Sequence, residues 1–402
     1  MASGTGIAVT LIQLGASLDG GTDGRGVRRL SGLVSGCRAG VLGAAFSVAL
    51  AACGGDEEMA APRPPVSAPA RVQETVVMWR GTVGTAAAPS ARYDIVALDA
   101  SARRPRVLTP RLGGEAQPLL FDRPSWSPDG DRIAFTVELD GDPGAPYRTD
   151  VYLMDADGGS VRRLTRSELA SHPLWSPDGR TIAFAKRASA RPGSARDLLS
   201  MTIWTISADG SGERKLVPPS GITADVPGAW SPDGESLAFT RHTYVDPEHS
   251  LQASAAIHSV GADGSNLRQL IEQGAEPAWS PDGGSLAYVS DRDRNGKLSY
   301  GDRTSFANEL YRASADGSDQ RRLTSTRDRN ERTPAWSPDS TRIAYTRGEQ
   351  YQNAEATSVL VVEADGDCPT EIAADPPPAR AWYANAVWRP GQSRSRFTPT
   401  CP

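Results

Sequence analysis

One five-residue word, Trp-Ser-Pro-Asp-Gly, recurs through this chain of 402 residues and constrains its fold more than any other feature. Copies or near copies begin at Trp126, Trp175, Trp230, Trp279 and Trp336, and a degenerate copy begins at Trp388. The copies follow one another at intervals of about 50 residues, a period typical of solenoids and propellers rather than of one irregular domain. The repeated unit is therefore the first thing to define.

Each unit predicts four short antiparallel strands. Ser-Pro-Asp-Gly favours a tight turn, because Pro presets φ, Ser and Asp bond to nearby backbone, and Gly suits the exit. After the first turn, Ile133 and Phe135 alternate with Ala134, and this period of two is that of a strand with one bulky and one small face. A second turn in each unit, such as Asp157-Gly158, joins the third strand to the fourth.

Four such strands with one aromatic residue ending the innermost strand predict a blade of a β-propeller. The chain after Trp388 is too short for a whole blade, but residues 74–80, 94–99 and 106–109 read as a second, third and fourth strand. We therefore expect an all-β, six-bladed propeller over residues 74–402, closed by N-terminal strands plus a C-terminal strand. In the alternative arrangement, the tail around Phe397 supplies its own second strand.

The repeated words resemble those of the TolB-like propeller repeat family (PD40, WD40-like), whose usual wording is Pro-x-Trp-Ser-Pro-Asp-Gly, Ile-Ala-Phe and Met-Asp-Ala-Asp-Gly. The resemblance covers roughly residues 74–391 and implies the propeller fold, but it implies little about function. The family's N-terminal α/β domain would have no room here. Ser340 replaces the turn glycine in one copy and Arg389-Pro390-Gly391 replaces Pro-Asp-Gly in another, so we expect altered turns there.

The N-terminus predicts export. The first residues have the layout of a bacterial secretory signal: a positive pair at Arg28-Arg29, an apolar run over residues 41–50, and the motif Leu-Ala-Ala-Cys ending at Cys53. This last motif resembles a lipobox. We expect a lipoprotein signal peptide over 1–52, lipidation of Cys53, and a Pro-rich tether over 53–73. The protein would then be anchored to a membrane of the bacterial envelope, at the outer membrane or cell surface. An ordinary signal peptide with a chance Cys is the alternative, and a start site placed too far upstream would explain the long leader.

Composition narrows the range of partners. A net charge of −5 with no basic stripe argues against nucleic acid. We expect a monomeric propeller that binds a protein, peptide or glycan of the cell envelope through the variable loops between second and third strands. A polysaccharide lyase or hydrolase using His242 and His249, which read as one variable loop, is the rival prediction, and a structural element of an envelope complex is a third. His258 reads as a strand-packing residue.

The two cysteines near the C-terminus, Cys368 and Cys401, form an even pair in a chain expected outside the cytoplasm. Such a pair predicts a disulfide that would fasten the C-terminal tail to the propeller. Two unrelated free thiols are the alternative.

A possible metal loop lies between the second and third strands of the unit that begins at Trp279. Its oxygen ligands fall at positions one, three, five, seven, nine and twelve of a calcium loop, with Gly296 at position six for the sharp turn. In order, these residues are Asp291, Asp293, Asn295, Lys297 through its carbonyl, Ser299 through water, and Asp302. The pattern resembles an EF-hand-like loop and predicts Ca²⁺ binding. The alternative is that the match belongs partly to the repeat itself, because TolB-type hairpins begin with a similar motif and bind no metal.

Overall fold

The computed structural model describes most of the chain between residues 74 and 390, and all its strands lie in one compact unit. The described residues are 74–82, 92–99, 105–108, 120–139, 148–188, 200–244, 253–292, 308–326, 329–349, 358–373 and 381–390. Within these ranges every regular element is a β-strand, which confirms the all-β prediction. No helix that could cross a membrane is found in these ranges.

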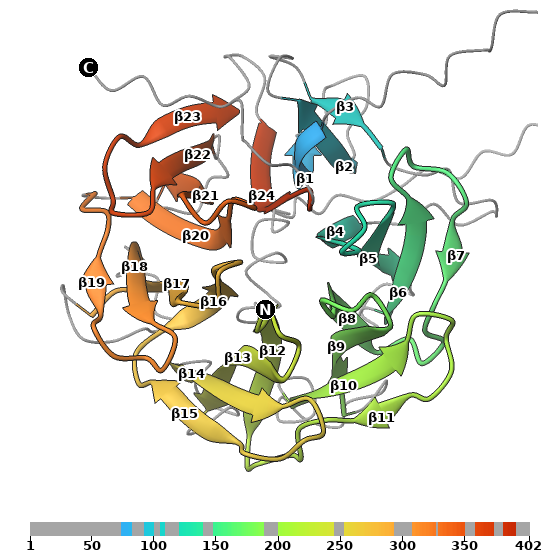
Figure 1. Ribbon diagram of the computed structural model, residues 1–402. Helices are drawn as coiled ribbons and strands as arrows, with labels where there is room; N and C mark the ends of the chain where they lie inside the picture. Colours follow the sequence, from blue (N-terminus) through green and yellow to red (C-terminus); the bar gives the residue numbers. More distant parts are fainter. Residues whose placement is uncertain are drawn as a thin grey trace, which may run out of the picture. The chain divides into compact units, whose positions relative to one another are not determined.

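The strands form antiparallel sheets around a common centre (Figure 1). The first sheet contains β1 (Glu74–Thr82), β2 (Arg92–Asp99), β3 (Arg106–Val107) and β24 (Ala381–Trp388). The second contains β4 (Leu120–Trp126), β5 (Arg132–Leu139), β6 (Arg148–Asp155) and β7 (Arg162–Arg163). Two more contain β16 (Ala275–Trp279), β17 (Ser285–Ser290), β18 (Glu309–Ser314) and β19 (Arg321–Arg322), and β20 (Arg329–Trp336), β21 (Arg342–Glu349), β22 (Ser358–Glu363) and β23 (Thr370–Ala373).

The remaining eight strands form a single sheet. They are β8 (Ala170–Trp175), β9 (Thr181–Arg187), β10 (Met201–Ser207), β11 (Arg214–Lys215), β12 (Thr223–Trp230), β13 (Ser236–Tyr244), β14 (Ala253–Gly261) and β15 (Arg268–Ile271). A parallel pairing of Met201 with Ala224 joins β10 to β12 and merges the two runs of four strands. The hydrogen-bonded topology of the described residues thus contains four separate four-stranded sheets, not the six that the repeat count predicts.

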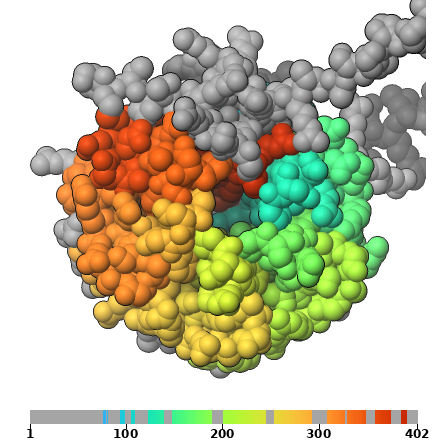
Figure 2. Space-filling model, in the orientation of Figure 1, coloured from blue at the N-terminus to red at the C-terminus, as the bar shows by residue number. Residues whose placement is uncertain are grey.

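The innermost strands define the centre of the propeller. β4, β8, β12, β16, β20 and β24 lie nearest the middle in Figure 1, and each contacts the next one around the ring. Every one of them ends at a repeat tryptophan, from Trp126 to Trp388. Figure 2 shows a hollow at the centre of this face.

The two ends of the described chain meet in one sheet. β24 pairs with β1 from Val76–Trp388 to Thr82–Ala381, and the strand order of this sheet is β24-β1-β2-β3. The predicted closure by three N-terminal strands and one C-terminal strand is confirmed. The strands predicted at 94–99 and 106–109 appear as β2 and β3, the first beginning two residues earlier and the second ending two residues earlier.

The alternation on the second strands builds the core between sheets. Ile133 and Phe135 pack with Val77 and Ile95 of the preceding sheet, whereas Ala134 faces Trp175 and its neighbours on the next. The bulky residues of β5 therefore face the preceding sheet, and its alanine faces the next sheet. Burial of this kind contributes about 25 cal/mol per Å² of apolar surface, so the repeated Ile-Ala-Phe word supplies much of the apolar core.

The Ser-Pro-Asp-Gly turns have the mechanism that their sequence predicts. Ser127 Oγ donates to Asp129 Oδ1 at 2.5 Å and accepts from Arg132 N–H at 2.9 Å. The hydrogen bond from Ser127 is the main reason that the pKa of Asp129 is lowered. Ser340 adopts the same left-handed conformation as the turn glycines, with φ of 58° against 71° at Gly130. The expected departure in turn geometry at Ser340 is therefore not found.

Side chains of the repeat also join neighbouring sheets. The indole N–H of Trp336 donates to Ala278 O at 3.1 Å, and that of Trp388 donates to Ala335 O at 2.9 Å. On the outer strands, Arg214 donates to Ala262 O of the next Ala-Asp-Gly turn at 2.8 Å. The arginines of the fourth strands are thus inter-sheet links as well as edge charges.

The second turn of most units needs glycine for close packing, the exception being Gly210, where a Cβ would lie 3.7 Å from its nearest neighbour. Gly158 has φ of 93°, and a Cβ there would lie 2.5 Å from the carbonyl oxygen of Leu108 on the preceding sheet. Only glycine combines this left-handed backbone with so close an approach. The Asp-Gly turns are therefore contacts between sheets rather than mere reversals of the chain.

Candidate functional site

The innermost strands share an irregularity three residues before each repeat tryptophan. Five non-glycine residues at this position have left-handed backbone, with φ between 51° and 57°. They are Arg123, His172, Glu276, Thr333 and Asn385. The pairing register of the innermost strand with its partner shifts at this point, as between Ser171 and Leu174. A bulge of this kind re-aims a side chain, and these side chains come from strands that surround the centre.

Two of the bulges donate their N–H groups to threonines on the second strand of the preceding repeat unit, β5 or β13. His172 N–H donates to Thr136 Oγ1 at 3.1 Å, and Glu276 N–H donates to Thr240 Oγ1 at 2.8 Å. Left-handed backbone at a non-glycine residue costs on the order of 1–3 kcal/mol and persists only where its surroundings fix it. The threonine contacts, which are buried or partly buried, are part of that fixation.

An ion pair links two of the innermost strands. Arg332 Nη2 lies 2.7 Å from Glu276 Oε1, and Thr333 N–H donates to Glu276 Oε2 at 2.6 Å. Desolvation of Glu276 by burial opposes its ionisation, but the charges of Arg332 and Arg123 and the Thr333 hydrogen bond together lower its pKa. Glu276 is therefore a carboxylate at neutral pH.

Two buried histidines lie in the same electrostatic environment. Burial is the largest cause of the lowered pKa values of His172 and His242, and the charge of Arg123 lowers both further. The pKa of His242 falls to about 4 although Glu276 opposes the shift. His172 Nδ1 also lies 2.8 Å from Ser171 Oγ. Both imidazoles are neutral at pH 7 and present one donor and one acceptor nitrogen each.

We call Arg123, His172, His242, Glu276 and Arg332 the axial cluster. They come from β4, β8, β13, β16 and β20, and four of these five strands are innermost strands. The charge of Arg123 acts on His172, His242 and Glu276, so one side chain of β4 couples residues of three other strands. The cluster contains two guanidinium groups, a carboxylate that is paired with one of them, and two neutral imidazoles.

The protonation states of the axial cluster limit what its groups can do chemically. An efficient general base has a pKa near the operating pH, whereas burial holds the pKa of His242 at about 4 and that of His172 well below 6.5. Neutral imidazoles and a fixed ion pair are instead well suited to orienting a polar ligand. Glu276 is already engaged by Arg332 and Thr333.

Sequence reasoning placed His242 wrongly and missed the other members of this cluster. His242 lies in β13, which runs nine residues from Ser236 to Tyr244, and its side chain is buried; it is not in a variable loop. His249 lies outside the described residues. His258 stacks on Phe239 in β14 with ring centroids 5.6 Å apart, which confirms its packing role. For Arg123, His172 and Glu276 the sequence did hold a signal, because each stands directly before the proline of the repeated Pro-x-Trp motif.

Of the predicted calcium ligands, Asp291 alone is described, directly after β17. Its side chain is 3% exposed, and among the described residues neither carboxylate oxygen has a hydrogen-bond partner. Burial raises the pKa of Asp291 to about 6. Asp293, Asn295, Lys297, Ser299 and Asp302 lie outside the described residues. Among the residues that are described, no three His, Cys, Asp or Glu side chains are grouped to hold a metal ion.

Two further predicted sites lie partly or wholly outside the described residues. Cys368 is disulfide-bonded and has left-handed backbone with φ of 55°, but Cys401 falls in the undescribed tail. Cys53 and the whole of residues 1–73 are also outside the described ranges. The pairing of Cys368 with Cys401 and the lipidation of Cys53 remain predictions.

The fold and the axial cluster define a β-propeller whose polar groups converge on its centre. No protein-family model and no curated protein matches the chain. Among solved structures, TolB from Acinetobacter baumannii is 18% identical, with a TM-score of 0.56 over 80% of this chain and 68% of that one. Hydrazine synthase from Kuenenia stuttgartiensis is 14% identical, with a TM-score of 0.54 over 81% of this chain and 48% of that one. At such identities the likeness shows the fold alone, a TolB-like propeller.

Proposed function

We propose that this chain is a lipid-anchored, extracytoplasmic propeller that binds a protein, a peptide or an envelope glycan without transforming it. The observation that carries the proposal is the axial cluster, because five polar or charged side chains from five strands converge where a purely structural ring could be filled with apolar groups. Buried polar groups are costly unless they are satisfied, so they are typical of a site that recognises a polar partner.

Six blades are the arrangement that the repeat favours. Within the eight-stranded sheet, β8–β11 and β12–β15 each repeat the order of the four-stranded sheets and each begin with a strand that ends at a repeat tryptophan. Met201–Ala224 is the pairing that joins them. We therefore count this sheet as two blades that touch along one edge.

The proposed envelope location rests on the sequence of the leader. Leu50-Ala51-Ala52-Cys53 follows a short apolar run, and lipidation there would hold the propeller at a membrane by a Pro-rich tether. Expression of Cys53→Ala tests this: the variant should lose metabolic labelling by palmitate and leave the membrane fraction. Retention of the label on the variant would contradict the anchor.

The ligand proposal is tested by binding with defined variants. Immobilised wild-type protein is exposed to envelope extract and to purified envelope glycans, in parallel with Arg123→Gln and Glu276→Gln. The control is Arg321→Gln, which removes a charge from an exposed outer strand. A ligand retained by wild type and by Arg321→Gln but lost by the axial variants supports the proposal. A glycan recovered in shorter pieces would instead indicate a lyase or hydrolase.

Calcium binding is a second proposal, supported by the burial of the Asp291 carboxylate. Burial of a carboxylate is costly when its oxygens lack partners, as those of Asp291 do among the described residues, and a bound cation would supply the missing partner. Asp291 also occupies position one of the calcium-loop pattern, where a ligand oxygen is needed. Calorimetric titration with Ca²⁺ tests it, with Asp291→Asn as the variant that should lose the heat of binding.

A further inference from the structure

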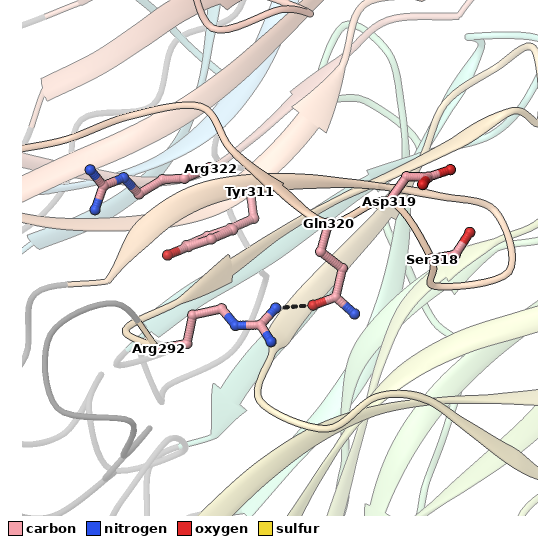
Figure 3. A pocket seen from close by; sticks show the side chains of 6 residues that line it. All are labelled: Arg292, Tyr311, Ser318, Asp319, Gln320 and Arg322. Atoms are coloured by element: carbon pink, nitrogen blue, oxygen red, sulfur yellow. Dashed lines mark hydrogen bonds between the residues drawn. The ribbon is translucent and has the colours of Figure 1, made fainter.

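A second polar recess lies on the outer strands of the sheet β16–β19, away from the axial cluster. Its volume is about 530 Å³, and six residues line it (Figure 3). They are Arg292, Tyr311, Ser318, Asp319, Gln320 and Arg322. Apart from the ring of Tyr311 this lining is polar or charged, so the recess suits a hydrophilic ligand rather than an apolar one.

Gln320 organises one side of the recess. Its Nε2 donates to Gly317 O at 2.8 Å, while its Oε1 accepts from the hydroxyl of Tyr288 at 3.3 Å and from the guanidinium of Arg292. Tyr288 is in turn stacked on Tyr311, with ring centroids 5.5 Å apart. Arg292 is thus oriented by a neutral carboxamide that is itself fixed. Within the described part of the chain the Arg292 guanidinium has this uncharged carboxamide as its partner.

Arg322 supplies a second cation from β19, directly opposite Tyr311 in the strand pairing. Its Nη2 donates to the hydroxyl of Ser325 at 3.2 Å. In Figure 3 the guanidinium of Arg322 and the hydroxyl of Tyr311 extend to the same side, while Asp319 and Ser318 lie at the other end. Asp319 accepts a hydrogen bond from Ser314 Oγ at 3.0 Å, away from both arginines. Two guanidinium groups and one phenol therefore flank the recess.

We propose that this recess binds an oxyanion, the carboxylate or phosphate group of a small hydrophilic ligand, through Arg292, Arg322 and the hydroxyl of Tyr311. Guanidinium groups bind planar and tetrahedral oxyanions with paired, charge-assisted hydrogen bonds. Gln320 is a positioning residue because it acts through Arg292. The recess shares no residue with the axial cluster, so the failure of either proposal leaves the other standing.

Calorimetry on the full-length protein at low ionic strength tests the proposal with three probes. Sodium glucuronate presents a sugar with a carboxylate, glucose presents the same ring without charge, and inorganic phosphate presents the oxyanion alone. We expect saturable binding of glucuronate, of phosphate or of both, and none of glucose. Binding of one probe alone identifies which oxyanion the recess prefers. Failure of both anions to bind, or equal binding of glucose, would overturn the proposal.

Variants separate this site from general attraction of anions. Arg292→Gln and Arg322→Gln should each weaken binding at least about tenfold, because each removes a charge-assisted hydrogen bond. Arg321→Gln removes the same charge from the same strand at a residue that does not line the recess, and it should bind as wild type does. Equal weakening by all three variants would show non-specific attraction and end the proposal.

A fourth variant tests the site with both arginines in place. Gln320→Glu introduces a carboxylate beside Arg292, and that internal ion pair should compete with the ligand and reduce binding at least about tenfold. Because no arginine is removed, loss of binding here cannot come from a lost contact of Arg322 elsewhere. The melting temperature of each variant confirms that it is folded. Wild-type affinity in Gln320→Glu would contradict the assignment of Arg292.

Discussion

The lowered pKa of His242 predicts that mild acid destabilises this protein and that one substitution reduces the effect. His242 is 7% exposed, and burial lowers its pKa from 6.5 to about 4. His242 therefore becomes protonated near pH 6.5 in the unfolded chain but only near pH 4 in the folded protein. The contribution of His242 to stability is complete above pH 6.5 and is lost as the pH falls towards 4. Between pH 6.5 and pH 5 this loss amounts to about 2 kcal/mol, at about 1.4 kcal/mol for each pH unit.

Urea denaturation at pH 6.5, 6 and 5 measures this loss. His242→Gln keeps a neutral polar side chain of similar length but cannot titrate, so its free energy of unfolding should fall by about 2 kcal/mol less than that of wild type between pH 6.5 and 5. The neighbouring charges of Glu276, Arg332 and Arg123 and the imidazole of His172 are present in both proteins and largely cancel in the comparison.

His258→Gln is the matched control, because His258 is only half-buried although burial also lowers its pKa. Its substitution should change the pH dependence less than that of His242 does. Any loss of stability that His242→Gln causes at pH 7 does not enter the comparison, which concerns the slope alone. The reasoning is refuted if His242→Gln loses as much stability as wild type on going from pH 6.5 to pH 5.

Three further outcomes follow from the described contacts. Gly158→Ala should destabilise the fold by about 3 kcal/mol, since it combines a left-handed backbone with a clash against the preceding sheet, whereas Gly221→Ala, with φ of 63° and nothing near its Cβ, should cost about 1 kcal/mol. Equal costs in urea denaturation would contradict the role of this turn in packing. If Asp291 binds Ca²⁺, free Ca²⁺ at a hundred times Kd should stabilise the protein by about 2.7 kcal/mol, and Asp291→Asn, unlike Asp316→Asn on an exposed turn, should abolish the response. A thermal melt unchanged by chelator in wild type would count against the site. Reduction of the disulfide at Cys368 should cost about 2–4 kcal/mol, and its partner is identified by mass spectrometry of unreduced peptides.

The sequence was sufficient to predict the scaffold because each repeated motif determines its own local structure. Ser127 and Asp129 hold the first turn with their side chains, and Gly158 allows the second turn to approach the neighbouring sheet. The alternation of Ile133, Ala134 and Phe135 assigns each residue to an interface. These are local properties, so a pattern of a few residues predicts them.

Other features depend on contacts between distant residues and could not be read in the same way. The pairing of Met201 with Ala224, which merges two blades into one sheet, comes from two strands of different units. His242 was assigned to a loop because the second strand was expected to end before it, whereas β13 continues to Tyr244 and no turn residue marks its end. The axial cluster was missed because a shift of register cannot be predicted from a period of two, which assumes unbroken alternation.

The position three residues before each tryptophan explains how one scaffold can carry different chemistry. The backbone there is left-handed in five units, and in two of them the neighbouring unit's threonine holds the N–H group. Yet the side chains are Arg, His, Glu, Thr and Asn. At His172 and Glu276 the N–H group is held by a threonine rather than by the residue's own side chain, although the side chain of Glu276 in turn accepts the N–H group of Thr333. A position with constant backbone geometry and changing side chains can encode a ligand preference without a change of fold. Under the proposed binding role, we therefore expect exchanges that keep the Glu276–Thr333 hydrogen bond to alter ligand binding more than stability.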